Sequence, residues 1–266
     1  MLGPLCVAVA TLEDDAASLL DSKKVHKSGN LSPLIRTCLG LAGREALLGF
    51  FDALREPFLD SQHNEPWFVE LLPQVIGELS RQVESEELRN SPAPLRELKL
   101  AILGTPPFNA LIEEGYNKAE VLLNLIRGLV DKTMERAAGE KVQIRCDRLG
   151  GRRYYSDVIG TWGGHVLELR EGPVESWYSC RWKNKLLEVD FTVKGDEKYP
   201  SIAAASLFAK LSREVLMLCM NRWWQLRVPG VRATAGYAQD APRFMKDIES
   251  YLTTHNIAPE NLVRRR

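Results

Sequence analysis

Three stretches of the chain carry short runs of branched or alternating apolar residues, a pattern that predicts β-strands. They cover residues 2–12, Val142–Asp147 and Leu187–Val193. The stretch 148–193, which includes the last of them, is rich in Gly, Trp and Tyr and has glycine-containing turns. This composition predicts antiparallel hairpins.

Apolar residues at helical spacing predict most of the remaining elements. We expect helices over these ranges: Ser32 to about Leu54, Asn109 to about Ala138 with Gly139 as its C-cap, Pro200 to about Gln225, and Ala241 to Leu252. Residues 55–100 carry apolar pieces broken by prolines and charges, and we expect a partly helical insertion there. The order of strands and helices predicts an α/β fold with a mixed sheet flanked by helices.

Composition limits the possible classes of protein. The chain has 266 residues, 45% apolar and 26% charged, which is typical of a globular domain with a large core. No apolar run is long enough for a membrane helix, and the five scattered cysteines indicate reduced thiols, so we expect a cytoplasmic protein without membrane association. The 35 basic and 35 acidic residues balance, so binding to nucleic acid has to come from local patches.

The most informative segment runs from Lys194 to Glu214. It places Asp196 in a glycine-containing turn after a strand, and Pro200 suits the first position of the following helix. A second aspartate, Asp147, ends another predicted strand. Two carboxylates brought together repel each other unless a cation lies between them, so this pair is a candidate site for a divalent metal.

The same segment closely resembles the ribonuclease H type 2 family (ribonucleases HII and HIII), which reads Lys-Gly-Asp, then Ile-Ala-Ala-Ser, Ala-Lys and an arginine. The resemblance implies one ribonuclease H-like domain over residues 1–266, with helical and β-hairpin insertions at about 55–100 and 152–185. The stretch between Asp147 and Asp196 is longer than in typical members, which indicates a divergent, larger bacterial subgroup.

The family resemblance implies an endonuclease that hydrolyses the RNA strand of RNA–DNA hybrids. Its catalysis would use two Mg²⁺ or Mn²⁺ ions, with Asp147 and Asp196 as catalytic metal ligands. The expected partner is an RNA–DNA hybrid or ribonucleotide-containing DNA, and the protein is expected to be a monomer.

The resemblance also implies residues that hold the nucleic acid. Lys23 and Lys24 lie in an Asp-Ser-Lys-Lys element and would approach its backbone. Ser206 and Lys210 match the serine and lysine of the family's helix, where the lysine would reach a phosphate. Tyr237 matches a Gly-Tyr element whose tyrosine stacks near the cleavage junction, although alanine replaces the usual following proline. Each residue also has an ordinary interpretation: Lys23 and Lys24 lie in a solvated turn, Lys210 extends into solvent, and Tyr237 packs against its neighbours.

One part of the family's pattern is missing from the sequence. The first strand of the family carries an Asp-Glu pair, which supplies two further metal ligands, and a glycine loop that senses the 2′-hydroxyl. Gly3-Pro4 matches the end of this motif, so the pair would precede Met1. Either the start was assigned at an internal methionine, which we favour, or the chain is truncated.

We therefore expect little or no hydrolytic activity from these 266 residues. The alternative function is a catalytically dead nucleic-acid-binding module on the same fold. A third is another metal-dependent nuclease or integrase of the ribonuclease H superfamily.

Basic and aromatic residues gather in two clusters. The first surrounds Asp147 and consists of Arg145, Arg148, Arg152, Arg153, Tyr154 and Tyr155. The second lies in the inserted hairpins and consists of Trp177, Tyr178, Arg181, Trp182, Lys183 and Lys185. Such clusters suit phosphate contact and stacking, or else the rings cover a small satellite core. Arg264–Arg266 are expected to form a disordered basic tail.

Overall fold

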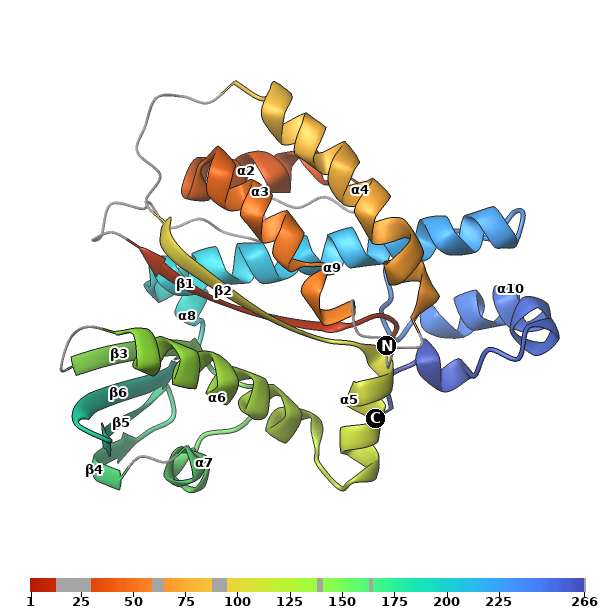
Figure 1. The fold of residues 1–266 in the computed structure, drawn as a ribbon. Helices are drawn as coiled ribbons and strands as arrows, with labels where there is room; N and C mark the ends of the chain where they lie inside the picture. The colour runs from red at the N-terminus through yellow and green to blue at the C-terminus, as the bar shows by residue number, and fades with distance from the viewer. Residues whose placement is uncertain (13–29, 59–64, 88–94, 138–140, 163–164, 266) are drawn as a thin grey trace.

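The structure is a computed structural model, and it describes residues 1–12, 30–58, 65–87, 95–137, 141–162 and 165–265 (Figure 1). The strands are β1 (Leu5–Leu12), β2 (Leu95–Leu103), β3 (Lys141–Asp147), β4 (His165–Glu171), β5 (Glu175–Trp182) and β6 (Lys185–Thr192). The α-helices are α2 (Ser32–Ala42), α3 (Arg44–Ala53), α4 (Pro66–Ser85), α5 (Thr105–Glu113), α6 (Lys118–Arg136), α7 (Ser156–Thr161), α8 (Gly195–Lys198), α9 (Pro200–Arg227) and α10 (Ala241–Thr254). Two 3₁₀ turns, η1 (Glu56–Phe58) and η2 (Pro259–Asn261), complete the described elements.

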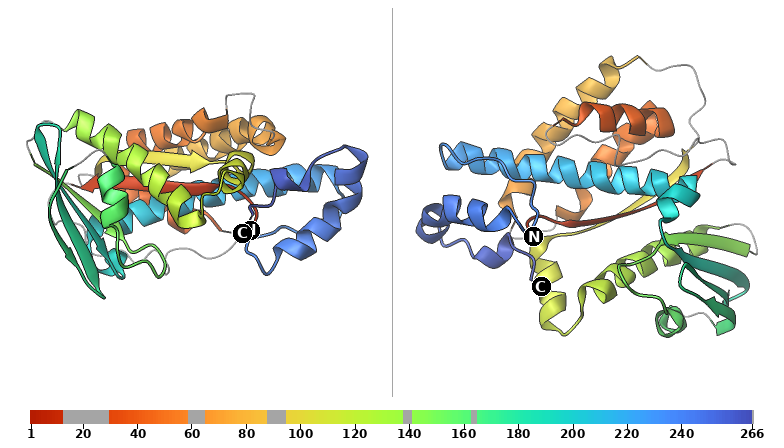
Figure 2. Two further views of the ribbon diagram at one scale, coloured as in Figure 1. Left: turned by 90° about the horizontal axis from the view of Figure 1, so that it is seen from below. Right: turned by 180° about the vertical axis from the view of Figure 1, so that it is seen from behind.

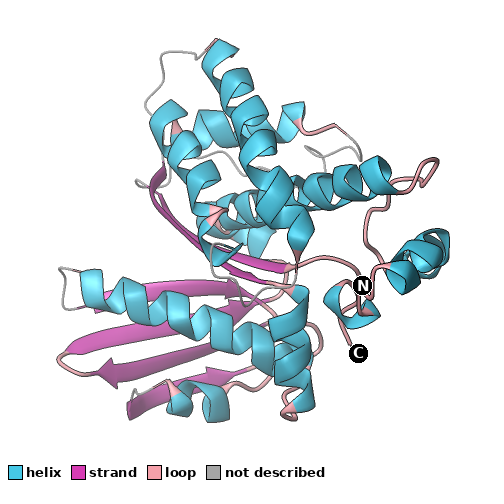
Figure 3. Cartoon of the chain, turned by 45° about the vertical axis from the view of Figure 1, so that its right-hand side comes forward, coloured by secondary structure: helices cyan, strands magenta, loops and turns pink. Residues whose placement is uncertain are grey.

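The strands form two sheets (Figure 3). A four-stranded sheet has the order β3-β6-β5-β4; β3 runs parallel to β6, and the other neighbours are antiparallel. The second sheet is an antiparallel ribbon of β1 and β2. The expected α/β fold with a mixed sheet and flanking helices is confirmed, and so are the hairpins of 148–193. The N-terminal strand, however, pairs with β2 in a separate ribbon and not with the mixed sheet.

Two hydrophobic cores correspond to these two sheets. The larger one surrounds α9, whose buried residues pack against α2, α3, α4, α10 and one face of the β1–β2 ribbon. The smaller one lies between α6, α7 and one face of the mixed sheet (Figure 2). Alternation in β6 explains the second core, because Leu187, Val189 and Phe191 are buried while Glu188 and Asp190 between them take the other face.

Two long helices expected from the sequence are each interrupted. Gly43, at φ 76° and ψ 171°, separates α2 from α3 within the predicted helix 32–54. The predicted helix 109–138 is α5 followed by α6, and α6 begins at a capping box in which the Asn117 side chain accepts from Glu120 N at 3.1 Å. It ends at Arg136, with Ala137 as its C-cap; Gly139 lies outside the described residues.

The stretch 55–100 holds α4 and the first part of β2, a strand that the sequence analysis missed. The stretch 152–185 holds α7, β4 and β5. No helix in the described part of the chain combines the length and apolar character needed to cross a bilayer.

The C-terminal residues do not form the disordered tail expected for Arg264 and Arg265. Arg264 N donates to Met1 O at 2.9 Å, and Arg265 N donates to Asn109 Oδ1 at 2.7 Å. The buried Asn109 side chain also donates to Glu260 O at 2.8 Å. Both the oxygen and the nitrogen of the Asn109 amide therefore form hydrogen bonds with C-terminal residues, and these bonds fix the C-terminus against α5. Arg266 lies outside the described residues.

Candidate functional site

The two aspartates singled out in the sequence meet at one edge of the mixed sheet. Asp147 ends β3, and its Cα partner on β6 is Thr192, the last residue of that strand. Because β3 and β6 are parallel, the chain leaves both strands at the same edge. The turn after β6 contains Lys194 in the left-handed region, at φ 54°, and leads directly into α8, whose first turn carries Asp196.

Asp147 holds this turn in place with one of its carboxylate oxygens. Its Oδ1 atom accepts hydrogen bonds from Gly195 N and from Arg148 N, both at 3.0 Å. Gly195 is buried, and a Cβ added to it would lie 2.7 Å from Ile202 Cδ1 and 3.4 Å from Asp147 Cα. Glycine therefore lets the turn lie close to both β3 and α9; a larger residue would require the Ile202 side chain to move.

A pocket of about 520 Å³ opens at this point. Its lining includes Asp147, Asp196 and Ser206, which the sequence analysis predicted as site residues. The other lining residues are Arg148, Gly150, Gly151, Arg153, Val193 and Lys194. The fold thus brings Asp147 together with Asp196 and Ser206, which follow it 49 and 59 residues later in the sequence.

The basic residues around Asp147 have different roles. Arg148 donates to Gly172 O at 2.8 Å and to Pro173 O at 2.5 Å, so it fixes the β4–β5 turn. Arg152 is bound to both carboxylate oxygens of Asp157 at 2.8 Å. Arg145 stacks over the Tyr199 ring, 4.1 Å from its centroid. Arg153 is exposed, and its guanidinium has no partner among the described residues, so it is the cation best placed to meet an anion in the pocket.

The second basic-aromatic cluster is largely structural. Tyr178 and Trp182 are buried in the smaller core. The ammonium group of Lys185 donates to Ala137 O at 2.6 Å, at the end of α6. The satellite-core interpretation therefore holds for the two rings, whereas Lys185 binds the end of α6.

The pocket offers a limited set of metal ligands. Asp147 Oδ2 and both carboxylate oxygens of Asp196 accept no hydrogen bond from any described residue, which leaves them available to a cation. Carboxylate oxygens of this kind suit one Mg²⁺ ion that keeps several of its waters. Across the described residues, however, no group of three His, Cys, Asp or Glu side chains is placed to hold a metal. The donor set thus falls short of what two ions require.

Two nearby acidic residues do not fill this gap. Glu188 accepts from Lys141 at 3.0 Å and from Gln143 at 2.8 Å. Asp190 accepts from Thr192 Oγ1 at 3.2 Å, and its burial, together with the negative charge of Glu175, raises the pKa of its carboxyl. Neither residue lines the pocket.

Two further predicted residues, Lys210 on α9 and Tyr237 in a later loop, lie on one side of α9 and away from the pocket. Ser206, Lys210 and Arg213 are spaced four and three residues apart, so they lie along one side of the helix. Lys210 is half-buried and does not line the pocket. Arg213 lies over the Tyr237 ring, 4.8 Å from its centroid, and Tyr237 is 53% exposed. An exposed aromatic ring therefore lies on the same side of α9, about 10 Å beyond Ser206 by helical rise.

Polar contacts from α9 hold the loop that carries Tyr237. Asn221 Nδ2 donates to Thr234 O at 2.9 Å, and Thr234 N donates to Asn221 Oδ1 at 2.8 Å. Arg213 donates to Ala235 O. Arg213 matches the arginine of the family's motif, but its contact with the loop could not be predicted from the sequence, because the two lie more than twenty residues apart.

Lys23 and Lys24, the last two predicted site residues, lie outside the described residues. A comparison with protein-family models finds no match to this chain, and a search of curated proteins finds none either. The resemblance to type 2 ribonucleases H therefore stays a prediction from the motifs.

Proposed function

We propose that the Asp147–Asp196 pocket is the phosphodiester site of a ribonuclease H type 2-like endonuclease that acts on RNA–DNA hybrids. The observation that carries this proposal is the shared pocket itself, which joins the carboxylates of Asp147 and Asp196 with the exposed cation Arg153. Lys194 also lines the pocket, where it forms an ion pair with Glu197 at 3.2 Å. Carboxylates for a divalent ion beside cations for phosphate are the combination that such chemistry needs.

Each residue has a distinct part in this proposal. Asp147 and Asp196 would hold Mg²⁺ or Mn²⁺, which when bound activates a water molecule and stabilises the leaving oxygen of a phosphodiester. Arg153 meets the scissile region as an exposed cation. Lys210 contacts the phosphate backbone farther along α9, and Tyr237 stacks on a sugar or base.

A second candidate function is a nucleic-acid-binding module without hydrolytic activity. It is favoured by the shortage of ligands: among the described residues the pocket holds only two carboxylates. Two-ion catalysis needs both the attacking and the leaving oxygen to be stabilised, which two carboxylates support poorly.

Cleavage assays separate the two functions. We expect the 266-residue protein to bind an RNA–DNA hybrid but to cleave little or none of it in Mg²⁺ or Mn²⁺. A labelled DNA duplex with one embedded ribonucleotide is the second substrate. EDTA-sensitive cleavage of either substrate would reject the inactive module. Failure to prefer a hybrid over plain duplex DNA would reject the hybrid-specific endonuclease, and failure to bind either nucleic acid would reject both functions.

The metal dependence of hybrid binding tests whether the two aspartates bind the metal, and it does not require hydrolytic activity. Mg²⁺ should strengthen hybrid binding several-fold, because it screens the repulsion between the two carboxylates and a phosphate. In the double variant Asp147→Asn/Asp196→Asn, affinity in EDTA should rise and the response to Mg²⁺ should disappear. Asp52→Asn on the exposed side of α3 is the matched control. An unchanged Mg²⁺ response in the double variant would contradict the assignment.

The surface along α9 gives a further prediction. Lys210→Ala and Tyr237→Ala should each weaken hybrid binding about fivefold, since they remove a phosphate contact and a stacking platform. Tyr237→Phe should keep the affinity, and Lys246→Ala on α10 is the control for charge. Fluorescence anisotropy over a salt series measures these effects, and the salt dependence should fall only for Lys210→Ala. Equal affinities for the Tyr237→Ala and Tyr237→Phe variants would argue against stacking.

A further inference from the structure

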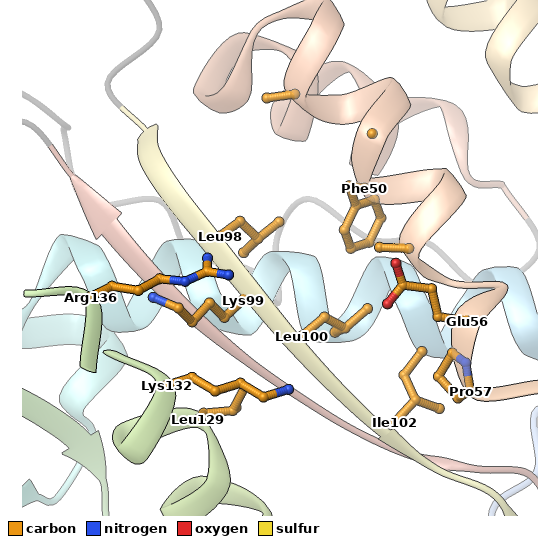
Figure 4. Close-up of a pocket in the computed structure, with 13 residues that line it drawn as sticks. Phe50, Glu56, Pro57, Leu98, Lys99, Leu100, Ile102, Leu129, Lys132 and Arg136 are labelled. Atoms are coloured by element: carbon orange, nitrogen blue, oxygen red, sulfur yellow. The ribbon is translucent and has the colours of Figure 1, made fainter. Parts of the chain in front are cut away.

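A second pocket, of about 360 Å³, lies along the outer edge of β2, away from the Asp147–Asp196 pocket (Figure 4). Its lining comes from both faces of that strand. Leu98, Leu100 and Ile102 pack toward the larger core, while Lys99, between Leu98 and Leu100, takes the opposite face. A pocket that touches both faces of one strand has to lie at that strand's edge.

This edge of β2 has no strand beside it in the described part of the chain. On its other edge β2 pairs with β1 over its whole length. In an antiparallel pair, alternate residues direct their N–H and C=O groups away from the partner. The pocket therefore exposes a row of backbone donors and acceptors, which is the template on which an extended peptide adds a strand.

The wall on the α3 side is mostly apolar and has room for side chains; the exposed Glu56 lies with Pro57 at the end of the pocket away from the cations (Figure 4). Ala46, Gly49 and Ala53 lie three and four residues apart on α3, and Phe50 lies beside them. Ala46 and Gly49 are exposed, and a Cβ added to Gly49 would meet nothing within 4 Å. Small residues opposite a strand edge leave space for apolar side chains of an added strand.

The wall on the α6 side is cationic. Lys99, Lys132 and Arg136 gather at one end of the pocket, with Leu129 beside them (Figure 4). Glu97 neutralises part of this charge, since it lies 2.7 Å from Lys99 and 3.6 Å from Arg136. Lys132 is exposed and has no ion-pair partner among the described residues. This wall therefore keeps a positive charge.

We propose that the outer edge of β2 binds an extended peptide segment of a partner protein in which apolar and acidic residues alternate. Successive side chains of a strand point to opposite faces. The apolar side chains enter the space beside Ala46 and Phe50, and the acidic ones meet Lys132 and Arg136. The backbone of the peptide pairs with the open edge of β2.

Other occupants match the pocket less well. A small amphipathic anion would satisfy the cations but leave the backbone groups of the edge unpaired. A second copy of this chain, paired through β2 by two-fold symmetry, would supply a strand that carries Arg96, Glu97 and Lys99 and so brings no excess of acidic residues. The alternating peptide satisfies the backbone, the apolar wall and the charge together.

Binding of a designed peptide tests this inference. The probe is fluorescein-labelled Val-Glu-Val-Glu-Val-Glu, compared with Val-Lys-Val-Lys-Val-Lys and with a Val-Glu peptide N-methylated at every residue. Fluorescence anisotropy should show saturable binding of the Val-Glu peptide alone. Lys132→Glu should weaken it about tenfold, and Ala46→Trp should abolish it by filling the space on the α3 side. Lys246→Glu, on α10, should have no effect.

The variants change exposed positions, and circular dichroism verifies that they remain folded. Two results would overturn the proposal: equal binding of the N-methylated peptide, or unchanged binding by both Ala46→Trp and Lys132→Glu. Sedimentation velocity provides a third, since a dimer of the free protein that Ala46→Trp dissociates would assign the edge to a second copy. None of these measurements depends on nucleic acid, so their outcome is separate from that of the proposed function.

Discussion

The free energy of unfolding of the unmodified protein should fall by about 3 kcal/mol through Glu65 as the pH rises from about 4.5 to about 7. In the Glu65→Gln variant this fall should be absent. Glu65 is the N-cap residue of α4 and is 1% exposed. Its Oε1 atom accepts from Thr105 N at 3.1 Å, at the start of α5, while Oε2 has no partner among the described residues. Burial raises the pKa of this carboxyl from 4.5 to about 7.

The direction of the effect follows from proton binding. Between pH 4.5 and 7 the folded protein keeps the Glu65 proton, whereas the unfolded chain has lost it. The folded state therefore binds more protons, and the free energy of unfolding falls as the pH rises through this window. Below the window the stabilisation is complete, and above it the folded state has to bury an anion.

Chemical denaturation at a series of pH values measures the effect. The stability of Glu65→Gln relative to the unmodified protein should increase by about 3 kcal/mol from pH 4.5 to pH 8, because the amide does not titrate. Glu249→Gln, at an exposed position on α10, controls for the loss of one carboxylate. Parallel stability curves for the unmodified protein and Glu65→Gln would show that the pKa of Glu65 is the same in the folded and the unfolded protein, which would contradict this prediction.

The strand ends and the helix behind them could be predicted from sequence because local signals agree there. An alternating run ends at Asp147, and Pro200 opens α9 as its fixed φ favours. The convergence of Asp147 and Asp196 then follows from one tertiary fact, the parallel pairing of β3 with β6. The motif resemblance implied that the two aspartates share a metal site, but neither it nor the periodicity predicted which strands pair.

The structure differs from the sequence-based predictions at places where contacts between distant residues determine the local conformation. The apolar periodicity continues across Gly43, so nothing local distinguishes one helix from two. The strand β2 alternates only weakly, and it becomes a strand through its pairing with β1. Arg265 is ordered by Asn109, more than a hundred residues earlier in the chain, a contact that no local pattern predicts.

Replacing Gly236 with alanine should destabilise the protein by about 3 kcal/mol and weaken hybrid binding through Tyr237. Gly236 has φ 74°, which an L-residue adopts only at a cost. A Cβ there would also lie 2.9 Å from Leu2 O, a backbone atom that cannot rotate away. The hydrogen bond from Leu2 N to Gly236 O, at 2.9 Å, would have to break or shift.

Gly230 provides a matched control, since it has φ 85° but a Cβ there would meet nothing within 4 Å. Gly230→Ala should cost only the backbone term, about 1 kcal/mol. The difference between the free energies of unfolding of the two variants, measured by chemical denaturation, then gives the cost of the contact with Leu2. Their hybrid affinities show whether this contact also affects Tyr237. Because the Tyr237 loop lies against the N-terminal residues at this point, a shift of Leu2 and a loss of hybrid affinity should occur together in Gly236→Ala. Equal destabilisation by the two substitutions would mean that the loop does not depend on this contact.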